Sequence, residues 1–443
     1  MIGEFRLNIL ADTFDYIYET ISKGGFIMKI SLALLVMLLP VMILIGCSDN
    51  SSSTDSPGTI ETPAPPSAAI QAEVVNAAND FGIKLFNWLS DEKPTKNVVI
   101  SPLSVSLAFG MALNGAGGQT YTDMQNALEL AGLTPDEINT TYRYMLDFLD
   151  GLDPEVILEI ANSMWIKDII EVKKPFIDVN VSNFDTEVTS LPFNNEAVGI
   201  INSWVAEKTH DKIKDVITFI APEDILFLIN AVYFKGTWTY EFDSTETSDA
   251  DFNKIDGSTM PCRMMYQENE FSYFGNRSVQ VVDLPYGNGD FSLTFVLPEQ
   301  GMTIDDIIAA LDVGTWDYWI ENLATDSGLV YLPKFKIEYE TSLKQSLAAM
   351  GMGIAFDIFN ADFSNIADIN PLYISGALHK TFIEVNEQGT EAAAVTVVTF
   401  GTTGVNDEDP YFVFNANRPF LIAIRERVSG SILFMGKILE PVL

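Results

Sequence analysis

One stretch close to the C-terminus, GTEAAAVTVVTFGTTG at residues 389–404, constrains the fold of this chain more than any other feature of its sequence. Its side chains are mostly small or β-branched, which favours a β-strand over a solvated loop. The even-numbered side chains from Thr390 to Phe400 are all suited to burial, whereas the one charge, Glu391, lies among the odd-numbered ones. No proline interrupts the stretch. The pattern predicts a strand-like segment in a stretch where a loop would be expected. The alternative is a flexible Ala/Thr-rich linker, in which the alternation would serve no purpose.

The N-terminus is predicted to be a targeting segment rather than part of the folded domain. Met28–Cys47 reads MKISLALLVMLLPVMILIGC, in which Lys29 precedes an apolar run that is too short for a comfortable membrane span of about 20 residues. The run ends in Leu-Ile-Gly-Cys, which resembles a bacterial lipobox. We therefore expect residues 1–47 to be an N-terminal extension and lipoprotein signal peptide, with lipid attached at Cys47. A buried helix and an ordinary signal peptide are the alternatives.

A flexible tether is expected between the lipid and the folded domain. Residues 48–68 are rich in Ser, Thr and Pro and contain little that a core could bury. A single globular domain is predicted over residues 69–443. Met28 is an alternative start of translation, in which case residues 1–27 are absent from the cell.

Charge and residue counts exclude several classes of function. The net charge of −36 repels phosphate backbones, so we expect no nucleic-acid partner. Two cysteines and two histidines exclude a disulfide framework and a Cys/His metal cluster, and they leave almost no base for triad chemistry. An enzyme and a cofactor are therefore not expected. His210 is interpreted as an exposed residue at a helix end, and Cys262 as a small core residue.

Hydrophobic periodicity predicts one α+β domain. Residues 70–92 have helical spacing, and residues 105–130 read as two helices around a glycine turn. Residues 157–166 and 225–238 are apolar without that period, which is typical of buried strands. Helices dominate the first part and strands the second, with no repeat and no second linker.

Six motifs in this order resemble the serpin family across residues 70–443. They are NVVISPLSVSLAFGMALNGAGGQT, NAVYFKGTW, DLPYGNGDFSLTFVLP, LPKFKIE, NEQGTEAAAVT and NRPFLIAI with SILFMGKILEP. The resemblance implies a serpin fold with a large central β-sheet, two smaller sheets, eight to nine helices and an exposed reactive-centre loop at about residues 387–410.

The resemblance also implies suicide inhibition of serine peptidases, and of cysteine peptidases as a further class. A protease cuts the loop and forms an acyl-enzyme, and the loop then inserts as a strand of the central sheet. The inhibitor supplies no catalytic residue. The loop hinge matches the small residues of inhibitory members, and it comprises Glu387, Gly389, Thr390, Glu391, Ala392, Ala393 and Ala394.

Family spacing places the scissile bond between Thr403 and Gly404. A small β-branched residue before the bond favours an elastase-like or subtilisin-like target. A shifted register would instead offer Phe400 to a chymotrypsin-like enzyme. Counting backwards from Pro419 gives a different bond, because the return segment is longer than in many serpins.

Two groups of polar residues match sites that control the central sheet in the family. Ser101, Asn230 and His379 match the shutter, where hydrogen bonds keep neighbouring strands closed. Glu387 and Lys334, with Trp238 beside them, match an ion pair at the top of the sheet, called the breach. The alternatives are a satisfied core histidine and a simple surface salt bridge.

Departures from the family concern partners and location. Residues 134–154 carry no basic helix, so we expect no heparin site, and a monomer is expected. The lipid anchor suggests a prokaryotic inhibitor outside the cytoplasm, anchored to the membrane through Cys47 or secreted. Two other functions remain open: a serpin-fold binding protein without inhibition, against which the hinge argues, and a surface hydrolase, for which a base is scarcely available.

Overall fold

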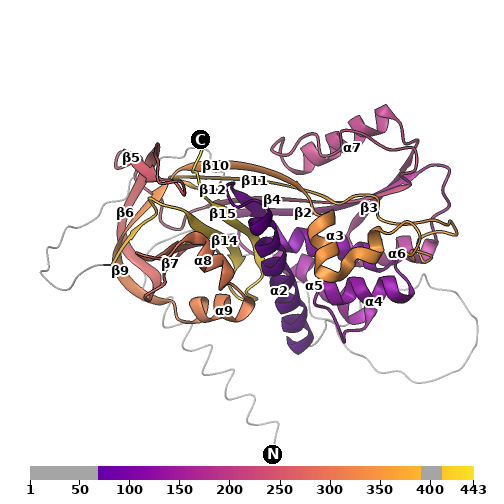
Figure 1. Cartoon of the computed structure of the whole chain (residues 1–443), viewed down its shortest axis with the longest axis horizontal. Helices are drawn as coiled ribbons and strands as arrows, with labels where there is room; N and C mark the ends of the chain where they lie inside the picture. The colour runs from indigo at the N-terminus through magenta and orange to yellow at the C-terminus, as the bar shows by residue number, and fades with distance from the viewer. Residues whose placement is uncertain (1–67, 391–411) are drawn as a thin grey trace, which may run out of the picture. The chain divides into compact units, whose positions relative to one another are not determined.

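The structure of this chain is a computed structural model that describes residues 68–390 and 412–443 (Figure 1). The predicted signal peptide and tether, with Cys47, lie outside the described residues. Within those described ranges, no helix has both the length and the apolar character needed to cross a membrane.

The part of the chain that the structure describes contains nine α-helices, most of them in its first half. Local signals set several of their starts: Ser101 caps α3 and is followed by Pro102, and Thr134 forms a capping box with Glu137 at the start of α5. The helices are α2 (Ala68–Glu92), α3 (Pro102–Leu113), α4 (Gly118–Ala127), α5 (Pro135–Leu149), α6 (Lys174–Phe184), α7 (Asn195–Lys208), α8 (Ile304–Ala309), α9 (Val313–Glu321) and α10 (Lys344–Leu347).

The central sheet is mixed and has six strands in the order β10-β11-β12-β4-β2-β3. Its long middle strands β2 and β4 pair antiparallel over eleven residue pairs, and β3 runs parallel to β2. The strands are β2 (Val156–Lys167), β3 (Thr186–Leu191), β4 (Leu226–Thr237), β10 (Phe335–Ser342), β11 (Leu378–Asn386) and the two-residue β12 (Gly389–Thr390).

The other nine strands form a second sheet around the long strand β6. One end of β6 pairs with β7, while most of its length pairs with β9 and its start with β5. The two smaller sheets that the family resemblance implies therefore share β6 and are continuous in hydrogen bonding. The strands are β1 (Val98–Ile100), β5 (Ser248–Asn253), β6 (Thr259–Gly275), β7 (Val279–Tyr286), β8 (Phe291–Pro298), β9 (Ala324–Pro333), β13 (Phe412–Asn415), β14 (Phe420–Glu426) and β15 (Ile432–Ile438).

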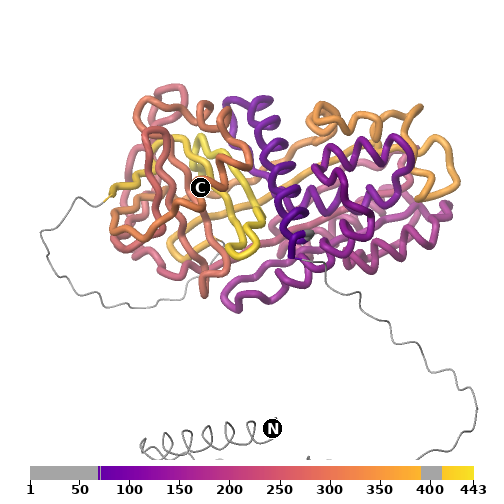
Figure 2. Tube along the Cα trace, turned by 90° about the horizontal axis from the view of Figure 1, so that it is seen from below, coloured from indigo at the N-terminus to yellow at the C-terminus, as the bar shows by residue number. Residues whose placement is uncertain are grey.

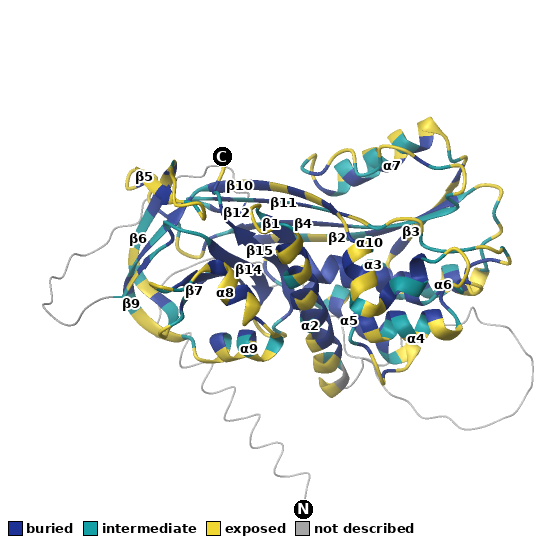
Figure 3. Ribbon diagram, viewed as in Figure 1, coloured by how far each residue is buried: buried dark blue, intermediate teal, exposed yellow. Residues whose placement is uncertain are grey.

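The central sheet separates the helices into two layers. Figure 1 shows α7 alone on one side of it, here called the outer face, and α2 to α6 on the other side, the inner face. In Figure 2 the indigo α2 runs between the strand-rich part of the molecule and the purple helices. Figure 3 shows in dark blue the buried residues between the helices and the sheets. Phe81 and Phe86 of α2 and Tyr142 of α5 are fully buried. The predicted α+β class is confirmed. Strands β7 and β8 form an antiparallel hairpin.

A buried ion pair ties β7, β8 and β14 together inside the second sheet. Arg425 donates to Asp283 at 2.8 Å, and both side chains are at most 5% exposed. Thr294 donates to the other oxygen of Asp283 at 2.6 Å. Arg427 also lies 3.6 Å from Asp283, but Asp283 is the carboxylate that pairs with the buried Arg425, so its loss leaves the Arg425 charge uncompensated in the core.

We expect Asp283→Asn to destabilise the fold by about 3–5 kcal/mol, because Arg425 would remain charged and buried. The midpoint of urea unfolding measures this effect. Asp249→Asn is the matched control, since Asp249 binds Arg263 at 2.9 Å in an exposed pair, and it should cost at most about 1 kcal/mol. Equal losses from the two variants would contradict the argument.

Candidate functional site

The candidate site is the seam of the central sheet between β4 and β11. Thr390 of β12 lies opposite Gly236 of β4 on one side and Val385 of β11 on the other. Among the described strands no ladder joins β4 directly to β11. The sheet is thus spread at this seam, and the first two residues after the β11 turn occupy its upper end.

This arrangement corrects one expectation from the sequence. The loop was predicted to be exposed from about residue 387, but Gly389 and Thr390 are buried, and Thr390 is only 2% exposed. The reason is that both residues satisfy their backbone groups as a strand between two neighbours.

Gly389 is required by the close approach of the backbone. Its φ of +149° lies in a region that other residues rarely adopt, and a Cβ at this position would stand 1.9 Å from the carbonyl oxygen of Gly236. Any side chain here would therefore push β12 away from β4.

Tyr286 holds Thr390 in the seam, and sequence reasoning missed it. The two hydroxyls are hydrogen-bonded at 2.5 Å, and the tyrosine ring stacks on Trp238 with 4.5 Å between ring centroids. A Cβ on Gly236 would meet the same ring at 2.8 Å. Complete burial raises the pKa of Tyr286, so its hydroxyl stays protonated. The sequence shows Tyr286 only as one residue of a hairpin, which gives no sign of this contact.

The breach residues lie together just above the seam. Lys334 binds Glu387 at 2.7 Å, and Thr247 donates to the second carboxylate oxygen at 2.9 Å. Trp238 donates through its ring nitrogen to the carbonyl of Asn386 and through its backbone to that of Gln388. Burial alone would raise the pKa of Glu387, but the Lys334 and backbone contacts outweigh it and hold that pKa below its ordinary value. With side chains only 27% and 13% exposed, the pair is better shielded than a surface salt bridge.

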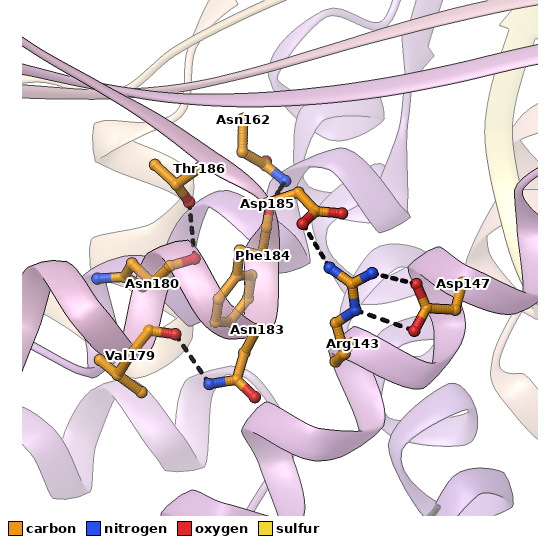
Figure 4. Close-up of polar contacts among 9 residues, drawn as sticks. All are labelled: Arg143, Asp147, Asn162, Val179, Asn180, Asn183, Phe184, Asp185 and Thr186. Atoms are coloured by element: carbon orange, nitrogen blue, oxygen red, sulfur yellow. Dashed lines mark hydrogen bonds and ion pairs between the residues drawn. The ribbon is translucent and has the colours of Figure 1, made fainter. Parts of the chain in front are cut away.

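The shutter residues divide into two separate contacts. The backbone N–H of Ser101 donates to Nε2 of His379 at 3.0 Å. Asn230 instead donates to Asn162, which in turn donates to the carbonyl of Phe184, as Figure 4 shows for the second bond. Sequence reasoning placed Asn230 with Ser101 and His379, but β4 and β11 are spread and Asn162 of β2 is the nearer partner.

Two shutter side chains, those of Asn230 and His379, differ in how their buried polar atoms are satisfied. The side-chain oxygen of Asn230 is buried and has no hydrogen-bond partner in the structure. His379 is 6% exposed, and burial lowers its pKa from 6.5 to about 4, so it stays neutral at ordinary pH.

A cavity of about 650 Å³ lies below β12 in the seam. Leu226–Ala231 of β4 line one side and Leu378–Lys380 of β11 the other, with α3 behind them. Asn230 and His379 both face it. Part of its wall is apolar, so the cavity suits an extended chain with alternating small apolar and hydroxyl side chains.

Several predicted site residues cannot be placed. Glu391, Ala392, Ala393, Ala394, Thr403 and Gly404 lie outside the described residues. Cys262 is buried, as predicted, and His210 is exposed at the end of α7, also as predicted. Within the described ranges, no three His, Cys, Asp or Glu side chains are grouped to hold a metal ion.

Comparison with known proteins identifies the family. The profile of the serpin (serine protease inhibitor) family matches residues 76–441, and the chain belongs to the serpin family. A serpin-like protein of Thermococcus kodakarensis is 34% identical over 83% of this chain and 86% of its own length. Human neuroserpin is 31% identical over 82% of this chain and 91% of its own. Serpins are generally protease inhibitors rather than enzymes.

Solved structures show the same fold. The native state of the thermophilic serpin tengpin has a TM-score of 0.76 at 32% identity, covering 83% of this chain and 94% of tengpin. Human thyroxine-binding globulin in complex with thyroxine also has a TM-score of 0.76, at 29% identity, and covers 84% of this chain and 100% of its own.

We expect His379 to make the fold less stable as the pH falls from 6.5 to 4. Between these pH values His379 is protonated in the unfolded chain but stays neutral in the folded one. The free energy of unfolding should therefore fall by about 3 kcal/mol. Denaturant unfolding at several pH values in this range measures the loss of stability. The loss should be about 3 kcal/mol smaller in His379→Gln, whose side-chain oxygen still accepts from Ser101. His210→Gln is the control and should keep the steep slope; equal slopes in the His379→Gln variant and the natural protein would exclude the proposed cause.

Proposed function

We propose that this protein inhibits serine proteases by suicide trapping, with its loop inserting into the seam between β4 and β11. The observation that carries the proposal is β12, because Gly389 and Thr390 already stand as the first residues of a strand between β4 and β11. The cavity below them leaves room for the strand to continue. Cysteine proteases with the same acyl chemistry form a further target class.

The register of β12 predicts which loop residue reaches the shutter. Thr390 lies opposite Gly236 and Val385, so six residues further along the same strand Thr396 would lie opposite both Asn230 and His379. Its hydroxyl would then be available to the unpartnered oxygen of Asn230. A threonine at this position completes the polar network that the spread seam leaves open.

The same register sorts the hinge side chains. Thr390 points inward, so Ala392 and Ala394 would follow it toward the core while Glu391 and Ala393 would point outward. Small inward side chains allow the strand to enter between strands that are already packed. Its net hydrogen bonds and apolar burial would release on the order of 10 kcal/mol, which rivals the stability of a whole domain.

The covalent chemistry belongs to the protease. Its nucleophile attacks the loop carbonyl and forms an acyl-enzyme, releasing the chain after the cut. Insertion drags the attached protease and distorts its oxyanion hole, so the ester is not hydrolysed. We place the cut between Thr403 and Gly404, which favours elastase-like or subtilisin-like targets.

The proposal is tested by mixing residues 68–443 with an elastase, a subtilisin and a chymotrypsin. Denaturing gels and intact mass spectrometry should show a detergent-resistant adduct and a released peptide that begins at Gly404. Complete cleavage without an adduct, with the protease fully active afterwards, would contradict inhibition of these enzymes.

Thr396→Arg should convert the inhibitor into a substrate, because a charge would have to enter the shutter. We expect at least tenfold more cleaved inhibitor per adduct. Glu391→Arg is the matched control: its register places it on the outer face beside Lys235 and Glu384, which are both partly exposed, and the adduct should persist. Equal effects of the two variants would refute the predicted register.

We further propose that the protein is lipid-anchored outside the cytoplasm through Cys47 and acts as a monomer without heparin or nucleic-acid partners. The lipobox-like sequence and the net charge of −36 support this. In a bacterial host, metabolic palmitate labelling of the full chain should be lost in Cys47→Ser, and the protein should leave the membrane fraction. Unchanged labelling would overturn the anchor.

A binding function without inhibition is the second candidate. It is supported by the similarity to thyroxine-binding globulin and by the open cavity in the seam. Cleavage without trapping, and without any gain in heat stability of the cleaved form, would favour it.

A further inference from the structure

The segment Thr209–Val216, which is the first part of the connection from α7 to β4 and is here called the strap, has an unusual backbone. Three of its residues have positive φ although none is glycine: His210 at +48°, Asp211 at +64° and Asp215 at +56°. His and Asp tolerate this conformation better than most residues, yet three within six positions is uncommon. Tertiary contacts must hold the strap in this shape.

A row of side chains crosses the outer face of the central sheet beneath the strap. If β12 continued in its present register, the residue three positions after Thr390 would lie between Tyr233 on β4 and Phe382 on β11. Glu159 of β2 is the ladder partner of Tyr233. The row therefore runs across the seam at a level that an inserted loop would pass.

On one side of the seam His210 fastens the strap to this row. Its Nε2 lies 3.0 Å from the carboxylate of Glu159, and its ring centroid lies 4.4 Å from that of Tyr233. The first contact is to strand β2 and the second is to strand β4.

On the other side of the seam the strap is attached to β11. The ammonium of Lys212 lies 4.9 Å from the ring centroid of Phe382, and Lys380 donates to the carbonyl of Lys214 at 2.7 Å. Ile213 packs in the same small cluster as Ala231 and Phe382. The strap thus spans the seam and connects the two strands between which the loop would enter.

We propose that His210 and Glu159 form a pH-dependent clasp that holds the strap across the seam and slows insertion of the loop at acid pH. This inference rests on the proposed inhibitory function. A neutral imidazole makes only a hydrogen bond to Glu159, whereas a protonated one makes an ion pair. A clasp of that kind is stronger at pH 5.5 than at pH 8.

We assign the pH response of the clasp to His210 after considering the titratable and charged groups around it. The titratable and charged groups near it are Glu159 on β2, Tyr233 on β4, Glu207 on α7 and Asp211 and Lys212 in the strap. The chain has one other histidine, His379, which is buried and neutral across this range. Because His210 and Glu159 are half exposed, the effect is modest, about two- to fivefold.

The test measures how many inhibitor molecules are cleaved per adduct, at pH 5.5 and pH 8.0, with a protease that forms the adduct. Slower insertion lets deacylation compete and raises this number. The number measured for each variant is divided by the number for the natural protein at the same pH. This ratio removes the pH dependence of the protease. We expect Glu159→Gln to lower the number about two- to fivefold at pH 5.5 and to leave it unchanged at pH 8.0. His210→Asn, which tolerates the left-handed backbone, should behave in the same way.

Glu187→Gln is the matched control. Glu187 binds Lys208 of α7 at 2.7 Å with similar exposure, but it lies on β3 and its contact does not cross the seam. It should give a ratio near one at both pH values. Equal ratios for Glu159→Gln and the natural protein at pH 5.5 would overturn the clasp while leaving inhibition intact.

Hydrogen exchange separates the clasp from the inhibitory function. In the intact protein without protease, amides of residues 209–216 should be better protected in the natural protein than in Glu159→Gln at pH 5.5, and equally protected at pH 8.0. If no protease is trapped, the proposed function fails and this measurement still decides the clasp. Equal protection at pH 5.5 would refute it.

Discussion

The arrangement of the central sheet depends on β12, which lies between β4 and β11 and pairs with both at the upper end of the seam. Only the backbone of Gly389 fits against the carbonyl of Gly236, and Thr390 completes the contact through Tyr286. These two residues satisfy the strand edges that would otherwise be unpaired at the top of the seam. Below them the edges of β4 and β11 face a cavity rather than each other. A sheet in this condition is complete at one end and incomplete at the other, which is the physical basis of the proposed loop insertion.

The elements around the seam couple it to the rest of the molecule. The breach ties the turn after β11 to the top of the second sheet through Lys334 and Glu387. The shutter ties β11 to the start of α3, because Ser101 caps that helix and also donates to His379. On the outer face the strap links β2, β4 and β11. Movement of β4 relative to β11 therefore changes contacts above, behind and in front of the sheet at once, and this coupling suits a device that responds to one cleavage.

Much of the fold and part of the site could be predicted from the sequence. Helical spacing in α2 and the glycine turn between α3 and α4 depend on neighbours in the chain, and so does the hairpin of β7 and β8. The family motifs also predicted the Lys334–Glu387 pair and its position beside Trp238. The pairing of Asn230 with Asn162 was not predictable, because it depends on how far β4 and β11 stand apart. Likewise Tyr286 and His210 become informative only when Thr390 and Glu159, distant in sequence, lie against them.

The sequence by itself determined that residues 389–404 have the alternation and small side chains of a strand, since side-chain size and β-propensity are local properties. It also determined the acidic charge, the scarcity of histidine and cysteine, and the α+β pattern. The tertiary structure alone decided that Gly389 and Thr390 are already in the sheet, that the smaller sheets join through β6, and that the strap crosses the seam. These features arise from contacts between residues far apart in the chain. Such contacts are chosen by packing and hydrogen bonding in three dimensions, for which no single segment carries the information.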